Sequence, residues 1–146
     1  MRDLPRKLTA EELAELFEGR TALVERLAEI EHPLERADDV IAELPEQEKL
    51  EALDAHPNIG QRAGLSARSK AEQGYEEDPA VLEELARLNL AYEEKFGFRF
   101  VVFMNRRPRS EIVPVLRERL DSSREEELDT ALHELVAIAR DRWQRA

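Results

Sequence analysis

The sequence predicts an all-α fold, a single-domain bundle of about eight helices over residues 1–146 with one short extended segment near residues 98–104. The length of 146 residues suits one domain with a single core. Apolar residues make up 42% of the chain and charged residues 38%. Because the apolar residues recur at helical spacing, a disordered chain is not expected. Pairs of residues that cap helix N-termini mark the starts of several helices.

Four amphipathic helices are expected before residue 56. The first begins at a capping box formed by Thr9 and Glu12, and Gly19 interrupts it. The second ends at His32, because the residue before a proline avoids the helical region. Pro45 opens the fourth as a first-turn proline. Their apolar faces are Leu13, Leu16 and Phe17, then Leu23, Val24, Leu27 and Ile30, then Leu34, Ala37, Val40, Ile41 and Leu44, and finally Leu50 and Leu53.

Four further helices are expected after residue 62. Capping residues place three of them, namely Ser69 with Glu72, Asp78 with Pro79, and Ser123 with Glu126. The remaining helix starts at Ser110, and it should hold Pro114 in its first turn because an interior proline removes a backbone hydrogen bond. The segment Phe96-Gly97-Phe98-Arg99-Phe100-Val101-Val102-Phe103 lacks helical spacing and is rich in aromatic and β-branched residues. We expect it to be buried and extended, with a lone strand as one interpretation.

The composition excludes several classes of function. The formal net charge of −11 argues against a nucleic-acid or anionic-membrane surface, since both need clustered cations. The chain has no cysteine, which excludes disulfides, thiolate nucleophiles, iron–sulfur clusters and thiolate zinc sites. There is no signal-peptide pattern, and no window approaches the ~18 apolar residues of a membrane span. We therefore expect a soluble, cytoplasmic protein.

Arg142 breaks the pattern of the last predicted helix. On a helical wheel, Leu128, Leu132, Leu135 and Ala139 form one apolar stripe, and Arg142 falls inside it. A guanidinium on an apolar face is unfavourable unless a carboxylate meets it. Two interpretations remain open. Either the helix frays and Arg142 reaches water, or the side chain faces a cleft and binds an anion through a two-pronged hydrogen bond.

His56 lies where the fourth predicted helix meets a loop. A His-Pro pair at a helix end is usually a turn, but Gly60 and Gly64 would let the backbone approach a ligand. The next helix N-terminus would offer amide hydrogens to an anion. Capping alone explains the spacing of Ser69 and Glu72. One histidine and one glutamate form no recognised metal-ligand set, so no metal is expected. These residues alone predict an acidic helical protein with a candidate anion-binding cleft.

Three motifs carry a resemblance to a known family. They are His56-Pro57-x-Ile59-Gly60-x-Arg62, then Ser69-x-x-Glu72-Gln73, then Leu88-Asn89-x-x-Tyr92-x-x-Lys95-Phe96-Gly97-Phe98-x-Phe100-Val101. In this order they resemble the 2-oxo-4-hydroxy-4-carboxy-5-ureidoimidazoline (OHCU) decarboxylases, which follow uricase and hydroxyisourate hydrolase in urate breakdown. The resemblance covers residues 50–146 well and the first third only by helix pattern. It implies an all-α enzyme that needs no cofactor and is usually a homodimer.

The resemblance also implies a reaction and a set of site residues. The reaction is removal of CO2 from OHCU, an anionic ureidoimidazoline, to give (S)-allantoin. His56 would be the catalytic acid or base and Glu72 its carboxylate partner. Arg142 matches a C-terminal arginine that pairs with an anionic part of the substrate. The other implied pocket residues are Pro57, Ser69, Lys70, Ala71, Gln73, Phe100, Val101, Val102, Phe103 and Met104, of which the last five would use backbone hydrogen bonds to the ureido and ring amides.

The sequence departs from the family pattern in three places. Arg99 stands where the family usually has proline, and it would add a cation at the pocket rim. The loop between Arg62 and Ser69 is shorter than usual. Residues 31–34 replace a tryptophan-bearing stretch. These departures leave two alternatives open, a decarboxylase of another small ureido acid and a non-catalytic helical binding module with the same fold.

Overall fold

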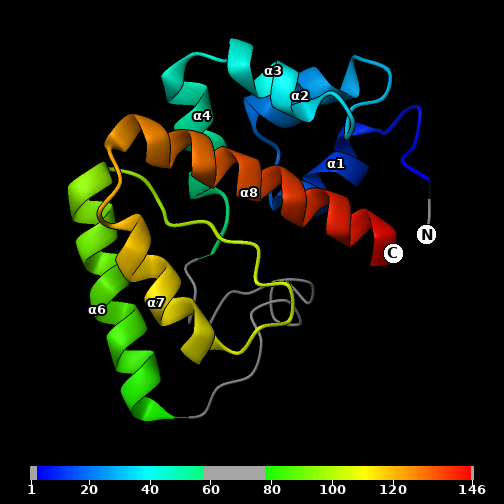
Figure 1. Ribbon diagram of the computed structural model, residues 1–146. Coiled ribbons are helices and arrows are strands. Elements are labelled where there is room, and N and C mark those ends of the chain that lie inside the picture. The colour runs from blue at the N-terminus through cyan, green and yellow to red at the C-terminus, as the bar shows by residue number, and fades with distance from the viewer. Residues whose placement is uncertain (1–2, 58–77, 146) are drawn as a thin grey trace.

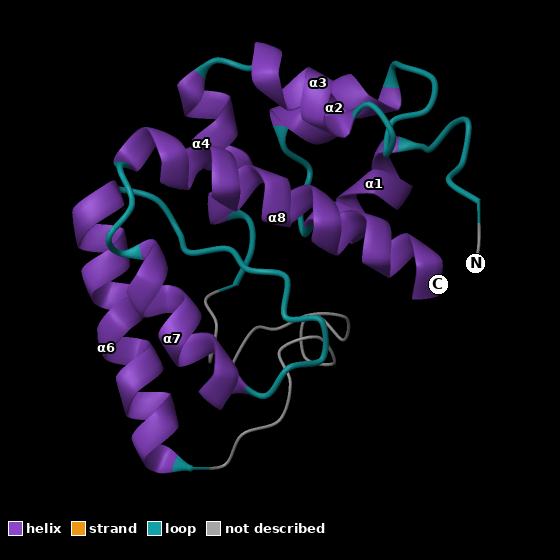
Figure 2. Cartoon of the chain, in the orientation of Figure 1, coloured by secondary structure: helices purple, strands orange, loops and turns teal. Residues whose placement is uncertain are grey.

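The computed structural model describes residues 3–57 and 78–145 (Figure 1). These ranges hold seven α-helices and no strand (Figure 2). The prediction of an all-α fold is therefore confirmed, whereas the helix expected at Ser69 lies outside the described residues. None of the described helices is long and apolar enough to span a membrane.

The first half of the chain forms four short helices, α1 (Ala10–Phe17), α2 (Ala22–Ala28), α3 (Ala37–Glu43) and α4 (Glu46–Asp54). The predicted capping box starts α1, since the Thr9 hydroxyl accepts from the Glu12 N–H at 3.1 Å and the Glu12 carboxylate accepts from the Thr9 N–H at 3.0 Å. Pro45 occupies the N-cap of α4 rather than its first turn. The proline still sets the N-terminal limit of the helix, because the residue before a proline avoids the helical conformation, and Leu44 is extended.

The second half forms α6 (Pro79–Phe96), α7 (Arg109–Arg119) and α8 (Arg124–Arg145). Helix α8 crosses the molecule, and α1, α3 and α4 pack against it, while α6 and α7 pack against each other (Figure 1). Asp78 caps α6 as predicted, with its carboxylate accepting from the Ala80 N–H at 3.0 Å. Ser123 likewise accepts from the Glu126 N–H at 3.2 Å at the start of α8. Helix α8 therefore links the two halves of the fold.

A long loop, residues 97–108, joins α6 to α7. The two helices run in the same direction, so the chain must return along their length before α7 can begin (Figure 1). Gly97 ends α6 in the left-handed conformation, with φ of 80°. Most of the loop's apolar side chains are buried, namely Phe98, Phe100, Val101, Val102 and Met104. The prediction of a buried non-helical segment is thus confirmed, but it is no strand, because no other described segment pairs with it along an edge.

Pro114 does not lie in the first turn of its helix. Helix α7 starts at Arg109, so the proline falls in the interior, and the expectation was wrong on this point. Ile112 and Leu116 on either side of it are fully buried. Packing of this apolar face offsets the hydrogen bond that the proline removes.

Four aromatic rings hold the loop against α6. Tyr92 contacts Phe96, Phe98 and Phe100 with ring centroids 4.7, 5.9 and 5.1 Å away. Tyr92 meets the other three rings in tilted or edge-on arrangements, which aromatic pairs favour. This cluster anchors the start of the loop whose later residues line the pocket described next.

Candidate active site

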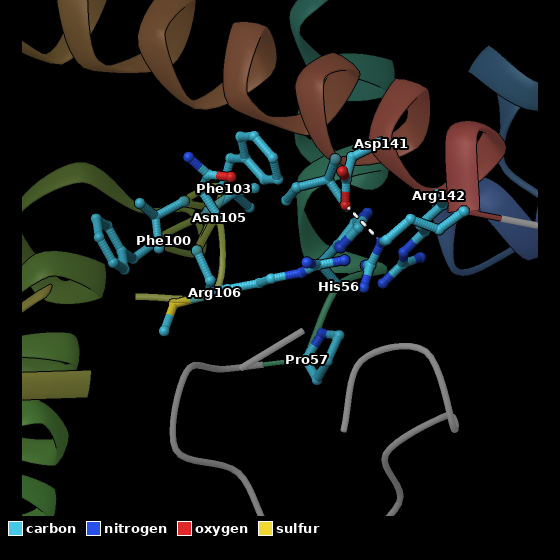
Figure 3. Close-up of a pocket in the computed structure, with 13 residues that line it drawn as sticks. His56, Pro57, Phe100, Phe103, Asn105, Arg106, Asp141 and Arg142 are labelled. Atoms are coloured by element: carbon cyan, nitrogen blue, oxygen red, sulfur yellow. Dashed lines mark ion pairs between the residues drawn. The ribbon is translucent and has the colours of Figure 1, made fainter. Parts of the chain in front are cut away.

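The candidate site is a pocket where three parts of the fold meet (Figure 3). His56 and Pro57 follow α4, the loop contributes residues 100–106, and the last turns of α8 contribute Ile138, Asp141, Arg142 and Arg145. The space within and in front of the pocket is about 660 Å³, its open mouth included. Among its described lining residues, three arginines face one aspartate. The local charge is therefore positive in a chain whose net charge is −11.

His56 is held at the pocket by its own backbone. Its N–H donates to the Leu53 carbonyl at 3.1 Å, which prolongs α4 by a final turn. Its carbonyl accepts a hydrogen bond from the Arg99 guanidinium. His56 is only 5% exposed, and its Nε2 has no hydrogen-bond partner in the described part of the chain. A buried nitrogen left without a partner is unfavourable, so this atom points to a role with a ligand.

The surroundings of His56 keep its imidazole neutral. Burial is the first cause, and the nearby cation of Arg142 is the second, so the pKa of His56 falls from 6.5 to about 3. Arg99 acts in the same direction, whereas the carboxylate of Glu18 opposes it. At neutral pH the ring is therefore uncharged, and one of its nitrogens keeps a lone pair that can accept a hydrogen bond.

Arg142 is buried, as its place in the apolar stripe of α8 indicated, with 2% of its surface exposed. The interpretation in which the helix frays and the side chain reaches water is wrong. Its guanidinium donates to the Leu16 carbonyl at 3.0 Å and pairs with the Glu18 carboxylate at 3.1 Å. Glu18 ends α1 with a left-handed φ of 63°. Arg142 therefore donates to a carbonyl at the C-terminal end of α1, where carbonyls lack helical partners, and at the same time it lines the pocket.

A second buried ion pair, Arg119 with Glu127, lies behind the pocket loop. Arg119 donates to the Val101 carbonyl at 2.8 Å, and its guanidinium carbon lies 4.5 Å from the centre of the Phe100 ring. The Tyr92 hydroxyl donates to the same Glu127 carboxylate at 2.6 Å. Sequence reasoning missed this network. The signal was present, since Arg119 continues the buried face of α7 at helical spacing from Ile112 and Leu116.

The loop residues expected to bind substrate through their backbones are partly committed to the protein. Arg107 donates to the carbonyls of Phe103 at 2.7 Å and Met104 at 2.9 Å, and Arg119 donates to the Val101 carbonyl. The N–H and C=O of Val102 have no hydrogen-bond partner among the described residues. Phe100 likewise has no backbone hydrogen-bond partner among the described residues. Arg107 and Arg119 therefore support the pocket wall, and the backbones of Phe100 and Val102 keep polar groups that the described residues do not pair.

Arg99 does not stand at the pocket rim, contrary to expectation. Its guanidinium donates to the Asp54 carbonyl at 3.0 Å and to the His56 carbonyl. Its N–H also donates to the Asp54 carboxylate at 3.2 Å. It therefore joins the loop to the C-terminal end of α4, where the helix leaves carbonyls without helical partners.

The remaining predicted site residues are Ser69, Lys70, Ala71, Glu72 and Gln73, which lie outside the described residues. Within the described ranges, no group of three histidine or acidic side chains is placed to hold a metal ion. The residues that the structure brings together are His56, Pro57, Arg142 and the loop 100–104.

Comparison with known proteins decides the family. The protein-family model described as OHCU decarboxylase matches residues 2–144, nearly the whole chain. The chain belongs to the OHCU decarboxylase family. The resemblance carried by the three sequence motifs is therefore confirmed.

Three members of the OHCU decarboxylase group show how far the similarity extends. A protein of Halalkalicoccus jeotgali with this name is 34% identical over 105 residues, which are 69% of this chain and 60% of that protein. One of Haloferax volcanii is 30% identical over 136 residues, 86% of this chain and 80% of that protein. A crystal structure of OHCU decarboxylase in the presence of (S)-allantoin matches with a TM-score of 0.73 at 25% identity, covering 90% of this chain and 94% of that one. The chain thus spans about three-fifths of the first relative and most of the other two.

Proposed function

We propose that this protein catalyses the cofactor-independent decarboxylation of OHCU to (S)-allantoin and CO2 in urate breakdown. The observation that carries the proposal is a buried, neutral imidazole whose Nε2 has no partner among the described residues, in a pocket lined by three arginines. Such a site suits an anionic substrate that must exchange a proton. Membership of the family supports the choice of substrate.

The chemistry of OHCU explains why side chains suffice. One ring carbon carries both the hydroxyl and the carboxylate, and it adjoins a C=N bond. When the bond to the carboxylate breaks, CO2 leaves and the electron pair moves toward that C=N bond, whose nitrogen takes up a proton. The hydroxyl becomes a carbonyl, and its proton ends on the neighbouring ring carbon, the stereocentre of allantoin. The substrate is its own electron sink, so the protein must orient the carboxylate and control the protons.

His56 is proposed to move the proton that sets the stereocentre. Being neutral, it first acts as a base and accepts the hydroxyl proton through Nε2. The substrate carboxylate favours this step, because a nearby anion raises the pKa that burial and Arg142 lower. Once CO2 has left, the imidazolium returns the proton to one face of the neighbouring carbon. Glu72 is proposed as the carboxylate that orients the ring or the substrate.

Arg142 and the loop are proposed to hold the substrate still during these transfers. Arg142 lines the pocket next to His56, so an anionic group beside it would lie within reach of the imidazole (Figure 3). The Val102 backbone offers one donor and one acceptor to the amides of the ring or the ureido group. Holding the carboxylate out of the ring plane aligns the breaking bond with the C=N system, which is an orientation effect.

We also infer that the chain works as a single domain in the cytoplasm and, from the resemblance, that it forms a homodimer. Light scattering after size-exclusion chromatography tests the assembly, with an expected mass of about twice 16.9 kDa. A mass of one chain at micromolar concentration would contradict the dimer and leave the assigned reaction untouched.

The reaction is tested with OHCU generated in place from urate by uricase and hydroxyisourate hydrolase. Circular dichroism should show (S)-allantoin forming faster than the spontaneous reaction, which gives racemic product. Racemic allantoin at the spontaneous rate would reject the proposal. If OHCU is left unchanged while a different ureido acid loses CO2, the related-decarboxylase alternative gains. Binding without turnover favours the binding module.

The role of His56 has its own test. His56→Gln keeps a polar side chain but no titrating nitrogen, so we expect kcat to fall by about 10² to 10⁴. His133→Gln is the matched control, because His133 lies on α8 outside the pocket with 71% of its side chain exposed. A His56→Gln protein as active as the parent would reject the assigned proton transfer even with the reaction confirmed.

A further inference from the structure

We propose that Arg106 is a specificity-determining residue that binds the carboxylate of the substrate. The inference rests on the proposed function for the identity of that substrate. It concerns a side chain that the sequence motifs do not include and that stands in a turn near the end of the loop 97–108. Three observations carry it, namely the backbone of the turn, the direction of the side chain, and the charges around it.

The turn places Arg106 at the pocket through a strained backbone. Asn105 and Arg106 both have a left-handed φ, 50° and 62° respectively. Two consecutive residues other than glycine in this region are unfavourable, and such strain persists where the surrounding structure enforces it. Arg107 supplies that support, because its side chain and N–H hold the carbonyls of Phe103 and Met104. The turn is therefore built to present a particular side chain.

Arg106 is an exposed residue whose side chain points into the site. Figure 3 shows Arg106 extending from the loop toward His56 and the end of α8. Arg106 lines the pocket together with both. A guanidinium in this place can meet a group bound beside the imidazole.

Arg106 also differs in charge balance from the other two pocket arginines. Arg142 pairs with Glu18 at 3.1 Å, and Arg145 pairs with Asp141 at 2.9 Å. Arg106 has no hydrogen bond or ion pair through its side chain in residues 3–57 and 78–145. In the described part of the pocket it is therefore the cation whose charge no carboxylate balances. A planar guanidinium of this kind matches a carboxylate through two parallel hydrogen bonds.

The chemistry of the reaction gives a sharp way to test this. The substrate has a carboxylate, whereas the product (S)-allantoin has the ring and ureido group without it. Arg106 should therefore contribute to binding of the substrate and contribute nothing to binding of the product. Arg106→Gln should raise KM for OHCU by about tenfold or more. Inhibition by (S)-allantoin should be unchanged.

Two further variants separate the effect of the Arg106 charge on binding from the effect of its backbone strain on stability. Arg106→Lys keeps the cation and should restore part of the affinity, because ammonium lacks the two-pronged geometry. Arg106→Gly relieves the left-handed strain, so it should raise the melting temperature while KM rises as in Arg106→Gln. Arg36→Gln is the control, since it removes the same charge from an exposed position outside the pocket. It should leave KM and the melting temperature as they are.

Calorimetry with allantoate, a ureido carboxylate, and (S)-allantoin completes the design. The parent should bind both, and Arg106→Gln should lose affinity for allantoate only. Loss of affinity for both compounds, or for neither, would overturn the inference. A parent that makes no (S)-allantoin yet loses allantoate selectively on Arg106→Gln would reject the proposed reaction and keep Arg106 as a carboxylate-binding residue. A parent that turns over OHCU, with a KM that Arg106→Gln leaves unchanged, would support the proposed reaction and reject Arg106 as the residue that binds the carboxylate.

Discussion

Arg119 and Arg142 use the same chemistry in two regions of the molecule. Each lies near the C-terminal end of a helix, each is at least nine-tenths buried, and each pairs with a carboxylate and donates to a backbone carbonyl. Arg119 stands behind the loop 97–108 and holds the Val101 carbonyl and the Phe100 ring. Arg142 stands in the pocket and holds the end of α1.

The two pairs differ in their carboxylates. Glu127 is 1% exposed and also accepts from Tyr92, whereas the Glu18 side chain keeps 15% of its surface. Glu127 is thus fully removed from water and depends on Arg119, while Glu18 retains some hydration. The comparison teaches that a buried arginine supports the fold or serves the site according to what else its guanidinium faces. We therefore expect Arg119 variants to act mainly on stability and Arg142 variants mainly on activity.

The largest effect is expected from breaking the pair behind the loop. Arg119→Leu leaves Glu127 as a buried anion without its cation, which should lower the free energy of unfolding by about 3–5 kcal/mol. Urea denaturation measures it. The double variant Arg119→Leu with Glu127→Leu should recover part of the loss, because no buried charge is left unpaired. A single variant that loses no stability would remove the basis of the comparison.

Next comes the effect of the pocket arginine on activity. Arg142→Gln removes a cation beside His56, and kcat/KM for OHCU should fall by about a hundredfold, the usual effect of losing one positioned donor. Arg140→Gln is the matched control, since Arg140 lies on the same helix and donates to the Leu34 carbonyl at 2.8 Å outside the pocket. Equal losses in both variants would mean that the activity merely follows damage to α8.

A smaller difference between the two arginines is expected in how stability depends on pH, because only Arg142 of the two helps to lower the pKa of His56. The pKa of His56 is about 3 in the folded chain and 6.5 ordinarily. Between these values the unfolded chain binds a proton that the folded chain does not. The contribution of the neutral His56 to the free energy of unfolding is therefore complete above about pH 6.5. It is lost as the pH falls toward 3, by at most about 1.4 kcal/mol per pH unit.

Urea unfolding between about pH 4 and about pH 7 measures this slope. His56→Gln should make the dependence shallower. Arg142→Gln should do so to a lesser degree, because its cation contributes to the lowered pKa. Arg119→Lys should leave the slope unchanged. A parent and a His56→Gln protein with identical slopes would contradict the neutral buried imidazole.

The smallest effect is expected at the carboxylate of the pocket pair. Glu18→Gln should lower the free energy of unfolding by about 1 kcal/mol. The Glu18 side chain is partly hydrated, and Arg142 keeps the Leu16 carbonyl at 3.0 Å. Glu127→Gln, measured in the same way, should cost clearly more. Equal costs would show that the depth of burial does not separate the two pairs.

Much of the helical scaffold could be predicted from local pattern. The capping residues at Thr9 and Asp78 were predictable because a cap and the amide it accepts from lie within a few residues. The burial of Arg142 was predictable because helical periodicity places it on the apolar face of α8. Pro114 was misplaced, since local propensity disfavours an interior proline and only the packing of α7 overrides it.

The sequence by itself determined the helices, the buried loop after α6, the family and the two side chains, His56 and Arg142, that meet at the pocket. These follow from periodicity, capping and motifs that are read along the chain. Only the tertiary structure decided the pairing of Arg119 with Glu127, the commitment of Arg99 to the end of α4 and the direction of Arg106. The reason is physical. An ion pair or a burial-shifted pKa depends on which distant groups packing brings within a few ångströms, and no local pattern contains that distance.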